Sequence, residues 1–447
     1  MSTTSDSIWQ KSKVLIKGLL IGFIVLLLLI PTFLVTDLIE EREQRQKEAI
    51  HEVSSKWAGR QNIAGPILII PYLDTYTDVQ NKAVTTKRLA FVLPDELNIS
   101  SSVRPQERTR GIYKVMLYTA NASVNGAFRN TTFDRLQIPV EKVLWQEAFV
   151  RFHLSDPKGL NEELKLQWND SLLTLTPAAE GGSGDAMEAA VPLTDAASLQ
   201  NIKFRTTLDI GGSEQILFTP LGKTSTVSVN AKWPHPSFTG DILPQTSQIK
   251  KDSFSAQWKS LAHKRSFPQQ WKGNEYSMQV KDQFRDKTSA VYAIGESAFG
   301  VNLFIPVNGY QKTMRSIKYA ILCIILTFAA FFLIDTIHKK SVHPLQYGLI
   351  GIALVLFYVL LLSFSEYIGF NSAYAIAAIA TIGLIGWFVK GVLSSGKLSF
   401  LLSVILLFVY SYVFTILQLQ DYALLLGSIG LFVTLAIIMY FSRKIQW

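Results

Sequence analysis

Residues 319–337, YAILCIILTFAAFFLIDTI, decide the class of this protein. The run is apolar over nearly its whole length, and a helix built from it would be about 28 Å long, which matches the hydrocarbon core of a bilayer. Basic residues stand on both sides of the run, Arg315 and Lys318 before it and Lys339 and Lys340 after it. The stretch therefore predicts a transmembrane helix over residues 315–337.

Other apolar runs lie on both sides of this helix, one far before it and four after it. Lys11, Lys13 and Lys17 precede the first run, and no small-x-small cleavage pattern follows that run. This arrangement predicts an uncleaved signal anchor rather than a signal peptide that is removed. The expected order is a tail at 1–13, a transmembrane helix at 14–36, a helical stalk at 37–64, a β domain at 65–314, and transmembrane helices at 315–337, 345–364, 373–389, 398–417 and 423–441.

The charges of the links between these helices alternate along the chain. The links at 338–343 and 390–397 are basic, whereas the links at 365–372 and 418–421 contain no Lys or Arg. Because cytoplasmic loops carry the excess of Lys and Arg, this pattern predicts six spans with both termini in the cytoplasm. The expected location is a bacterial inner membrane, crossed several times, with residues 37–314 in the periplasm.

The excess of positive charge belongs to the membrane part of the chain. Residues 37–314 hold 32 Lys and Arg and 30 Asp and Glu, whereas the whole chain has a net charge of +9. A basic patch of the kind that binds nucleic acid is therefore not indicated, and we expect no nucleic-acid partner. Cys323 is the only cysteine, so the β domain must be stable without an internal disulfide bond.

Short apolar or alternating runs separated by turn residues predict an all-β domain, a sandwich or a strongly curved sheet. The expected strands include residues 67–70, 89–93, 111–118, 148–153, 172–175, 216–218, 226–229 and a last pair within 290–306. A Gly-, Ser- and Ala-rich stretch at 178–190 is a possible division of the domain into two halves.

One segment of the β domain is the candidate interaction site. It is rich in proline, glycine and aromatic residues, which excludes a central strand and predicts a rigid turn. Two interpretations apply to its histidine: it contacts a metal or ligand, or it bonds to backbone while the aromatic side chains fill the core. A lone histidine without clustered acids or cysteines favours the second. The candidate residues are Trp233, Pro234, His235, Pro236, Phe238 and Asp241.

The chain carries no sequence motif for catalysis or for a cofactor. His51 and Glu52 begin like the zinc-protease pattern H-E-x-x-H, but Ser55 occupies the position of the second histidine. Charged residues of the apolar runs lie near their ends, and Asp335 is one turn before His338 and Lys339, which predicts an interfacial ion pair. We therefore expect a protein that is not an enzyme and has no cofactor or metal.

The chain resembles the CreD family of Gram-negative inner-membrane proteins over nearly its whole length. The most specific stretch is Trp-Pro-His-Pro-Ser-Phe at 233–238, continued by Gly-Asp at 240–241 and Leu-Pro at 243–244. Further matching stretches are 65–72, 111–113, 155–160, 310–311, 318–320, 326–328, 343–347, 365–366 and 421–428. Tyr367 and Gln446 differ from the family pattern, in which we expect a histidine and an acid.

The resemblance implies a role in cell-envelope integrity, regulation by a carbon-source-responsive two-component system, and altered tolerance to colicins and β-lactams. It implies no catalytic or cofactor residue. We expect the β domain to support the envelope by binding lipid, peptidoglycan or an envelope protein. One alternative is a transporter or flippase for lipids or small ligands, which would need a hydrophilic cavity through the helices. A second alternative is a periplasmic hydrolase, which would need acids or a Ser/His pair that meet in a cleft.

Overall fold

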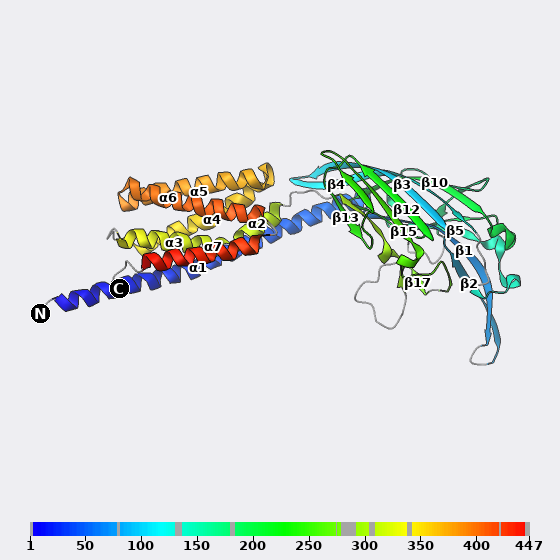
Figure 1. Ribbon diagram of the computed structural model, residues 1–447, viewed down its shortest axis with the longest axis horizontal. Helices are drawn as coiled ribbons and strands as arrows, with labels where there is room; N and C mark the ends of the chain where they lie inside the picture. The colour runs from blue at the N-terminus through cyan, green and yellow to red at the C-terminus, as the bar shows by residue number, and fades with distance from the viewer. Residues whose placement is uncertain are drawn as a thin grey trace. The chain divides into compact units, whose positions relative to one another are not determined.

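The computed structural model describes residues 3–77, 81–129, 136–178, 184–273, 275–278, 292–303, 309–337, 342–419 and 422–442. The chain forms two compact units (Figure 1). One comprises Met1–Lys47 and Val307–Trp447 and is helical, and the other comprises Glu48–Pro306 and consists mainly of strands. The β-rich middle of the chain and the apolar helices before and after it confirm the expected membrane protein with a β domain.

In the described residues, the β unit contains one nine-stranded and one eight-stranded sheet. The first has the order β13-β19-β11-β1-β5-β9-β8, with β2 beside β1 and β16 beside β2; the second has the order β14-β15-β12-β3-β4-β10-β6-β7. The nine-stranded sheet comprises β1 (Gln61–Thr77), β2 (Ala83–Val92), β5 (Phe149–Leu154), β8 (Thr176–Pro177), β9 (Ala186–Ala190), β11 (Gln215–Phe218), β13 (Pro236–Gly240), β16 (Gln270–Lys272) and β19 (Phe299–Leu303). The eight-stranded sheet comprises β3 (Glu96–Arg110), β4 (Tyr113–Phe128), β6 (Lys165–Trp168), β7 (Ser171–Thr174), β10 (Ile202–Ser213), β12 (Thr224–Ala231), β14 (Thr246–Ile249) and β15 (Phe254–Leu261). The short strands β17 (Tyr276–Ser277) and β18 (Tyr292–Ala293) pair with each other.

Side chains from both sheets form one hydrophobic core. Trp258 of β15 stacks on Phe299 of β19 with 5.7 Å between ring centroids, and Phe238 of β13 meets Trp258 edge-on, also at 5.7 Å. Every second residue of β3 from Leu97 to Val103 is buried, as expected for a strand with one face on a core. The two sheets therefore pack face to face as a sandwich.

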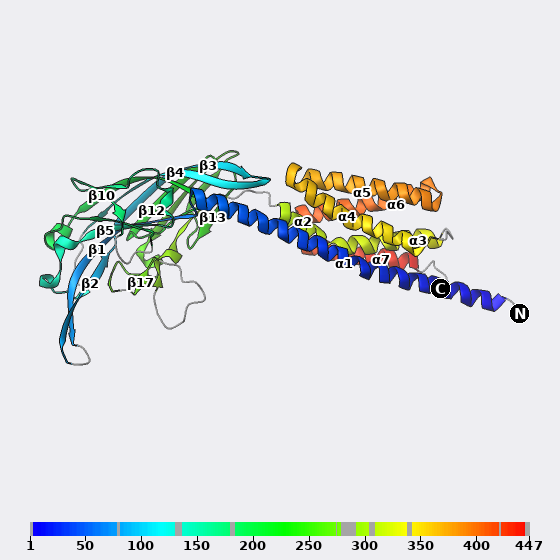
Figure 2. The same ribbon diagram turned by 180° about the vertical axis from the view of Figure 1, so that it is seen from behind.

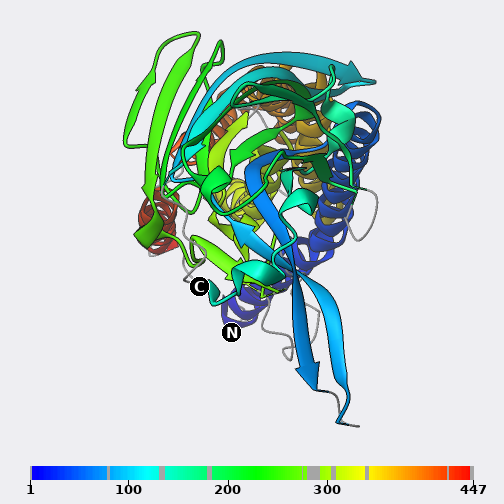
Figure 3. The same ribbon diagram turned by 90° about the vertical axis from the view of Figure 1, so that its right-hand side faces the viewer.

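The outer parts of β3 and of the β1–β2 hairpin are more exposed than the centres of the sheets. The outer half of β3 is exposed, and so is much of the ladder between β1 and β2 near its turn. Figure 3 shows the β1–β2 hairpin projecting from the other strands of the unit. Near its turn the β1–β2 ladder exposes both faces. Opposite the outer half of β3, in contrast, Val115 and Met116 of β4 are buried.

The β unit begins and ends a few residues away from the expected limits of 65 and 314. β1 begins at Gln61, because the apolar alternation extends back through Ile63 and Ala64. At the other end, α2 (Gly309–Lys318) is helical where we expected the end of the β domain. Buried Tyr310, Thr313 and Ile317 share one face of α2, a helical spacing that the apolar content of the segment alone did not suggest.

The stretch at 178–190 does not divide the β domain. β8 ends immediately before it and β9 forms its last five residues, and the two strands are antiparallel neighbours in the same sheet. All of Glu48–Pro306 belongs to one compact unit. Residues 179–183 of the stretch lie outside the described part of the chain.

The helical unit contains most of α1 (Thr3–Trp57) and all of the C-terminal helices. Figure 2 shows α1 as one continuous helix, and Pro31 lies inside it. In the described residues, four helices are long and apolar enough to cross a membrane, and the pair α2 and α3, bent by 44°, would be a fifth. The expected number of six spans stays a prediction. The C-terminal helices after α2 are α3 (Ala320–Ile337), α4 (Pro344–Ile368), α5 (Phe370–Leu393), α6 (Gly396–Gln418) and α7 (Ala423–Ser442).

Asp156 joins the end of α1 to the sandwich. Its Oδ2 accepts a hydrogen bond from the Gly59 N–H at 2.9 Å, and its Oδ1 accepts one from the Lys158 N–H at 3.2 Å. Gly59 lies between the last residue of α1 and the first residue of β1. The carboxylate therefore satisfies a backbone donor at the point where the helix changes into a strand.

We expect Asp156→Ala to destabilise this junction by about 1–2 kcal/mol, because the Gly59 N–H loses a charged acceptor. Trypsin cleavage of the full-length protein at Lys56 and Arg60 measures the effect and should become faster. Asp195→Ala is the matched control, since the Asp195 carboxylate accepts a local bond, from the Ser198 N–H at 2.8 Å. Equal cleavage rates in the two variants would contradict the assignment.

Candidate functional site

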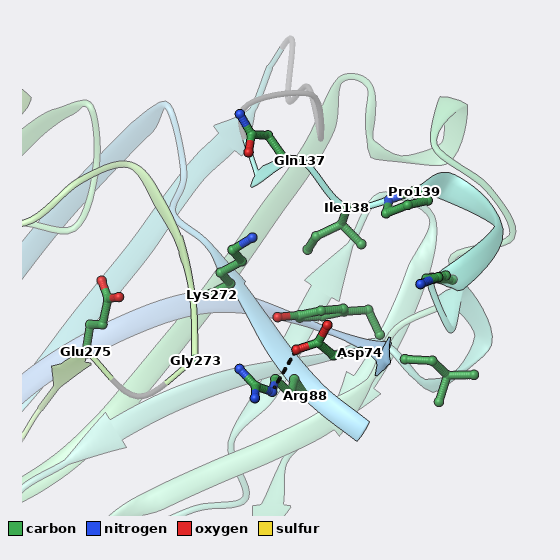
Figure 4. A pocket seen from close by; sticks show the side chains of 11 residues that line it. Asp74, Arg88, Gln137, Ile138, Pro139, Lys272, Gly273 and Glu275 are labelled. Atoms are coloured by element: carbon green, nitrogen blue, oxygen red, sulfur yellow. Dashed lines mark ion pairs between the residues drawn. The ribbon is translucent and has the colours of Figure 1, made fainter. Parts of the chain in front are cut away.

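A polar pocket in the β unit is the candidate site. It lies where β1, β2 and β16 meet the segment that precedes β5, and its volume is about 370 Å³ (Figure 4). Most of its walls are polar or charged, with a smaller apolar part. The lining residues are Tyr72, Leu73, Asp74, Arg88, Gln137, Ile138, Pro139, Lys142, Lys272, Gly273 and Glu275.

Backbone pairing brings these distant residues together. In the antiparallel ladder of β1 and β2, Tyr72 lies opposite Arg88. β16 continues the sheet on the other side of β2, so Lys272 lies opposite Ala90. The segment with Gln137 and Pro139 is attached to β1 by the bond from the Leu144 N–H to the Pro71 carbonyl, 2.9 Å long.

Cationic side chains from three segments line the pocket, together with two carboxylates. Arg88 Nε pairs with Asp74 Oδ2 at 3.0 Å, and Lys272 Nζ donates to the Leu136 carbonyl at 3.2 Å. Lys142 lies on the wall formed by the segment 136–142, and Glu275 lies just after β16. The lining therefore carries three positive and two negative side chains, a formal net charge of +1.

Tyr72 contributes a hydroxyl group to the same pocket. Burial raises the pKa of its phenol, and the neighbouring Asp74 carboxylate raises this pKa further. The Tyr72 phenol therefore stays protonated at neutral pH and keeps an O–H that can donate a hydrogen bond. Cations together with an O–H donor make this arrangement suited to an anionic ligand.

The expected interaction segment lies elsewhere in the β unit, and only part of it is a turn. Pro236–Gly240 form β13, the edge strand of the nine-stranded sheet, paired with β19. A proline is compatible with this position because an edge strand has one side without ladder partners. Trp233 and Phe238 are half-buried against the core, and the Asp241 N–H donates to the Ala298 carbonyl at 3.2 Å.

His235 is exposed beside this edge strand. The Trp233 indole N–H donates to the His235 carbonyl at 3.1 Å, and the two rings meet edge-on with 6.4 Å between centroids. No group of three or more His, Cys, Asp or Glu side chains within the described residues is placed to hold a metal ion. The described contacts of His235 are those of a turn residue next to a packed tryptophan.

The helical unit contains a buried ion pair that differs from the expected one. Asp335 of α3 pairs with Lys17 of α1 and accepts a hydrogen bond from the Tyr347 hydroxyl of α4 at 3.2 Å. The Asp335 side chain is only 2% exposed. We expected Asp335 to pair with residues 338 and 339, which lie outside the described residues. Lys17 was not found from the sequence because it is 318 positions away from its partner.

Comparison with known proteins agrees with this architecture. A family model described as "Inner membrane protein CreD" matches residues 13–447. The chain belongs to the CreD family. The Inner membrane protein CreD of Escherichia coli (strain K12) is 31% identical over 430 residues, which cover 95% of this chain and 91% of that protein. The family and the apolar helices support an inner-membrane location with several crossings.

Proposed function

We propose that this protein supports cell-envelope integrity without catalysing a reaction. In this proposal the β domain lies on the periplasmic side of the inner membrane, both termini lie in the cytoplasm, and the β domain binds an envelope component. Membership of the CreD family supports an inner-membrane protein. The observation that carries the binding role is the polar pocket, which Arg88, Lys142 and Lys272 line from three segments.

Crosslinking in living cells tests this binding role. A photoreactive amino acid is placed at Gln137, an exposed residue of the pocket wall, or at Ser237, an exposed residue of the edge strand β13. Position 203, exposed on β10 of the other sheet, is the matched control. We expect an adduct with lipid, peptidoglycan or an envelope protein from 137 or 237, and none from 203.

The same positions test on which side of the membrane the domain lies. Gln137→Cys should react with a membrane-impermeant maleimide in cells whose outer membrane has been permeabilised, whereas the native Cys323 is buried. Absence of adducts from both 137 and 237 contradicts the binding role. Absence of labelling at position 137, with labelling restored in lysed cells, contradicts the periplasmic location.

Transport of a lipid or small ligand is the second candidate function. Buried carboxylates among membrane helices commonly mark pathways for ions or substrates. Asp335 is such a group, and its Oδ1 has no hydrogen-bond partner within the described residues. The buried Asp335 carboxylate favours transport under one condition. A variant that keeps the helices packed without this carboxylate must lose the function of the protein.

A further inference from the structure

We propose that the pocket bounded by Tyr72, Arg88, Lys142 and Lys272 binds a phosphate ester of the size of a lipid headgroup. The inference rests on the proposed function, because it names the chemical class that the β domain would recognise. It depends on the positions of the cationic groups, on what holds them in place, and on the size and polarity of the space between them.

The Arg88 guanidinium is held in position without using all its donors. Asp74 engages its Nε at 3.0 Å, and the Tyr76 ring lies 6.0 Å from its Cζ. A guanidinium has five N–H donors, so the bond to Asp74 leaves donors for a ligand. Two oxygens of one phosphate can accept from such a fork at the same time.

Lys272 is likewise oriented by the protein. Its ammonium donates to the Leu136 carbonyl at 3.2 Å, and an ammonium has two further N–H donors. In Figure 4 its side chain extends between the Gln137–Pro139 wall and the Asp74–Arg88 pair. The bond to the Leu136 carbonyl therefore positions the exposed Lys272 ammonium at the pocket wall.

The number of donors and their origin on several segments favour phosphate over carboxylate. Arg88, Lys142 and Lys272 come from β2, from the segment before β5 and from β16, and Tyr72 adds an O–H from β1. A tetrahedral phosphate presents oxygens in more directions than a planar carboxylate, so it suits donors that line a pocket from several segments. Lysine acts in such sites as a point charge and arginine as a fork.

The carboxylates and the volume define the size of the ligand. Asp74 and Glu275 reduce the formal charge of the lining to +1, which does not suit a long polyanion. A volume of about 370 Å³ is at the small end of ligand pockets. Leu73, Ile138 and Pro139 are the apolar lining residues, so the walls suit a polar head rather than an acyl chain.

Calorimetric titration of the full-length protein in detergent, with sn-glycerol 3-phosphate as the probe, tests the inference. We expect saturable binding that weakens as salt is added. Lys142→Gln and Lys272→Gln should each weaken binding about tenfold, because each removes a charged donor. Lys203→Gln, which changes an exposed lysine of β10, should leave binding unchanged. Lys142→Gln is the more direct variant, since Lys272 also bonds to the protein.

Three results would overturn the inference: no binding of the probe, equal binding by the lysine variants and the wild type, or equally tight binding of succinate. A competition arm identifies the source of the phosphate. Phosphatidylglycerol in nanodiscs displaces the probe if the site takes a lipid headgroup, and does not if it takes a soluble ester. Crosslinks from position 137 without probe binding would reject the phosphate ester and keep the binding role. Probe binding without crosslinks would keep the phosphate-ester site and reject the binding role in cells.

Discussion

Lys17→Met is expected to destabilise the helical unit by about 3–5 kcal/mol, because it leaves a buried carboxylate without its counter-ion. Asp335 is 2% exposed, and its described partners are Lys17 and the Tyr347 hydroxyl. Tyr347 is itself packed against Phe331, with 4.8 Å between ring centroids, so it cannot move freely to compensate. The measurement is the thermal midpoint of the full-length protein in detergent, followed by size-exclusion chromatography.

The double variant Lys17→Met with Asp335→Asn separates the pair from its surroundings. Replacing both charges is much less costly than removing one, so this variant should regain most of the lost stability. Glu366→Gln is the matched control, because Glu366 is partly exposed and a glutamine can still accept from the Tyr310 hydroxyl, now at 2.9 Å. If the Lys17→Met protein is as stable as the wild type, the ion pair has no structural role.

The same double variant decides between the two candidate functions. If it folds and still protects the envelope, the ion pair serves assembly of α1 with α3 and α4. If it folds but no longer protects the envelope, the Asp335 carboxylate itself is needed, and transport becomes the better explanation.

Trp258→Ala is expected to destabilise the β domain by about 3–5 kcal/mol, the usual cost of removing a large buried aromatic side chain. Trp258 has no exposed surface and contacts the other sheet through Phe238 and Phe299. Its removal leaves a cavity between the sheets, where backbone ladders limit how far the walls can move inwards. Thermal unfolding of the full-length protein, with proteolysis of the β domain as readout, measures the loss.

Trp258→Phe should cost clearly less than Trp258→Ala. The phenyl ring keeps most of the packing against Phe238 and Phe299. In addition, the Trp258 indole N–H is buried without a hydrogen-bond partner within the described residues, and phenylalanine removes this unsatisfied donor. Equal losses for the two variants would show that the ring contacts between the sheets do not determine stability here.

The sequence contains local signals both for the interaction segment and for α2. Proline at 234 and 236 excluded a central strand, and the structure places β13 at an edge. Buried positions 310, 313 and 317 follow a helical period, so α2 could have been recognised as an amphipathic helix before the apolar run. The residues between the buried positions of α2 are polar, so the segment resembles the end of the β domain in sequence.

The sequence by itself determined the apolar helices, the β-rich middle and the family, because length, hydropathy and strand alternation are local properties of the chain. Only the tertiary structure decided which side chains meet. The pocket joins residues 72–74 with 88, 136–142 and 272–275, and the ion pair joins Lys17 with Asp335. Such contacts depend on the pairing of strands and the packing of helices far apart in the chain, and no local pattern specifies those partners.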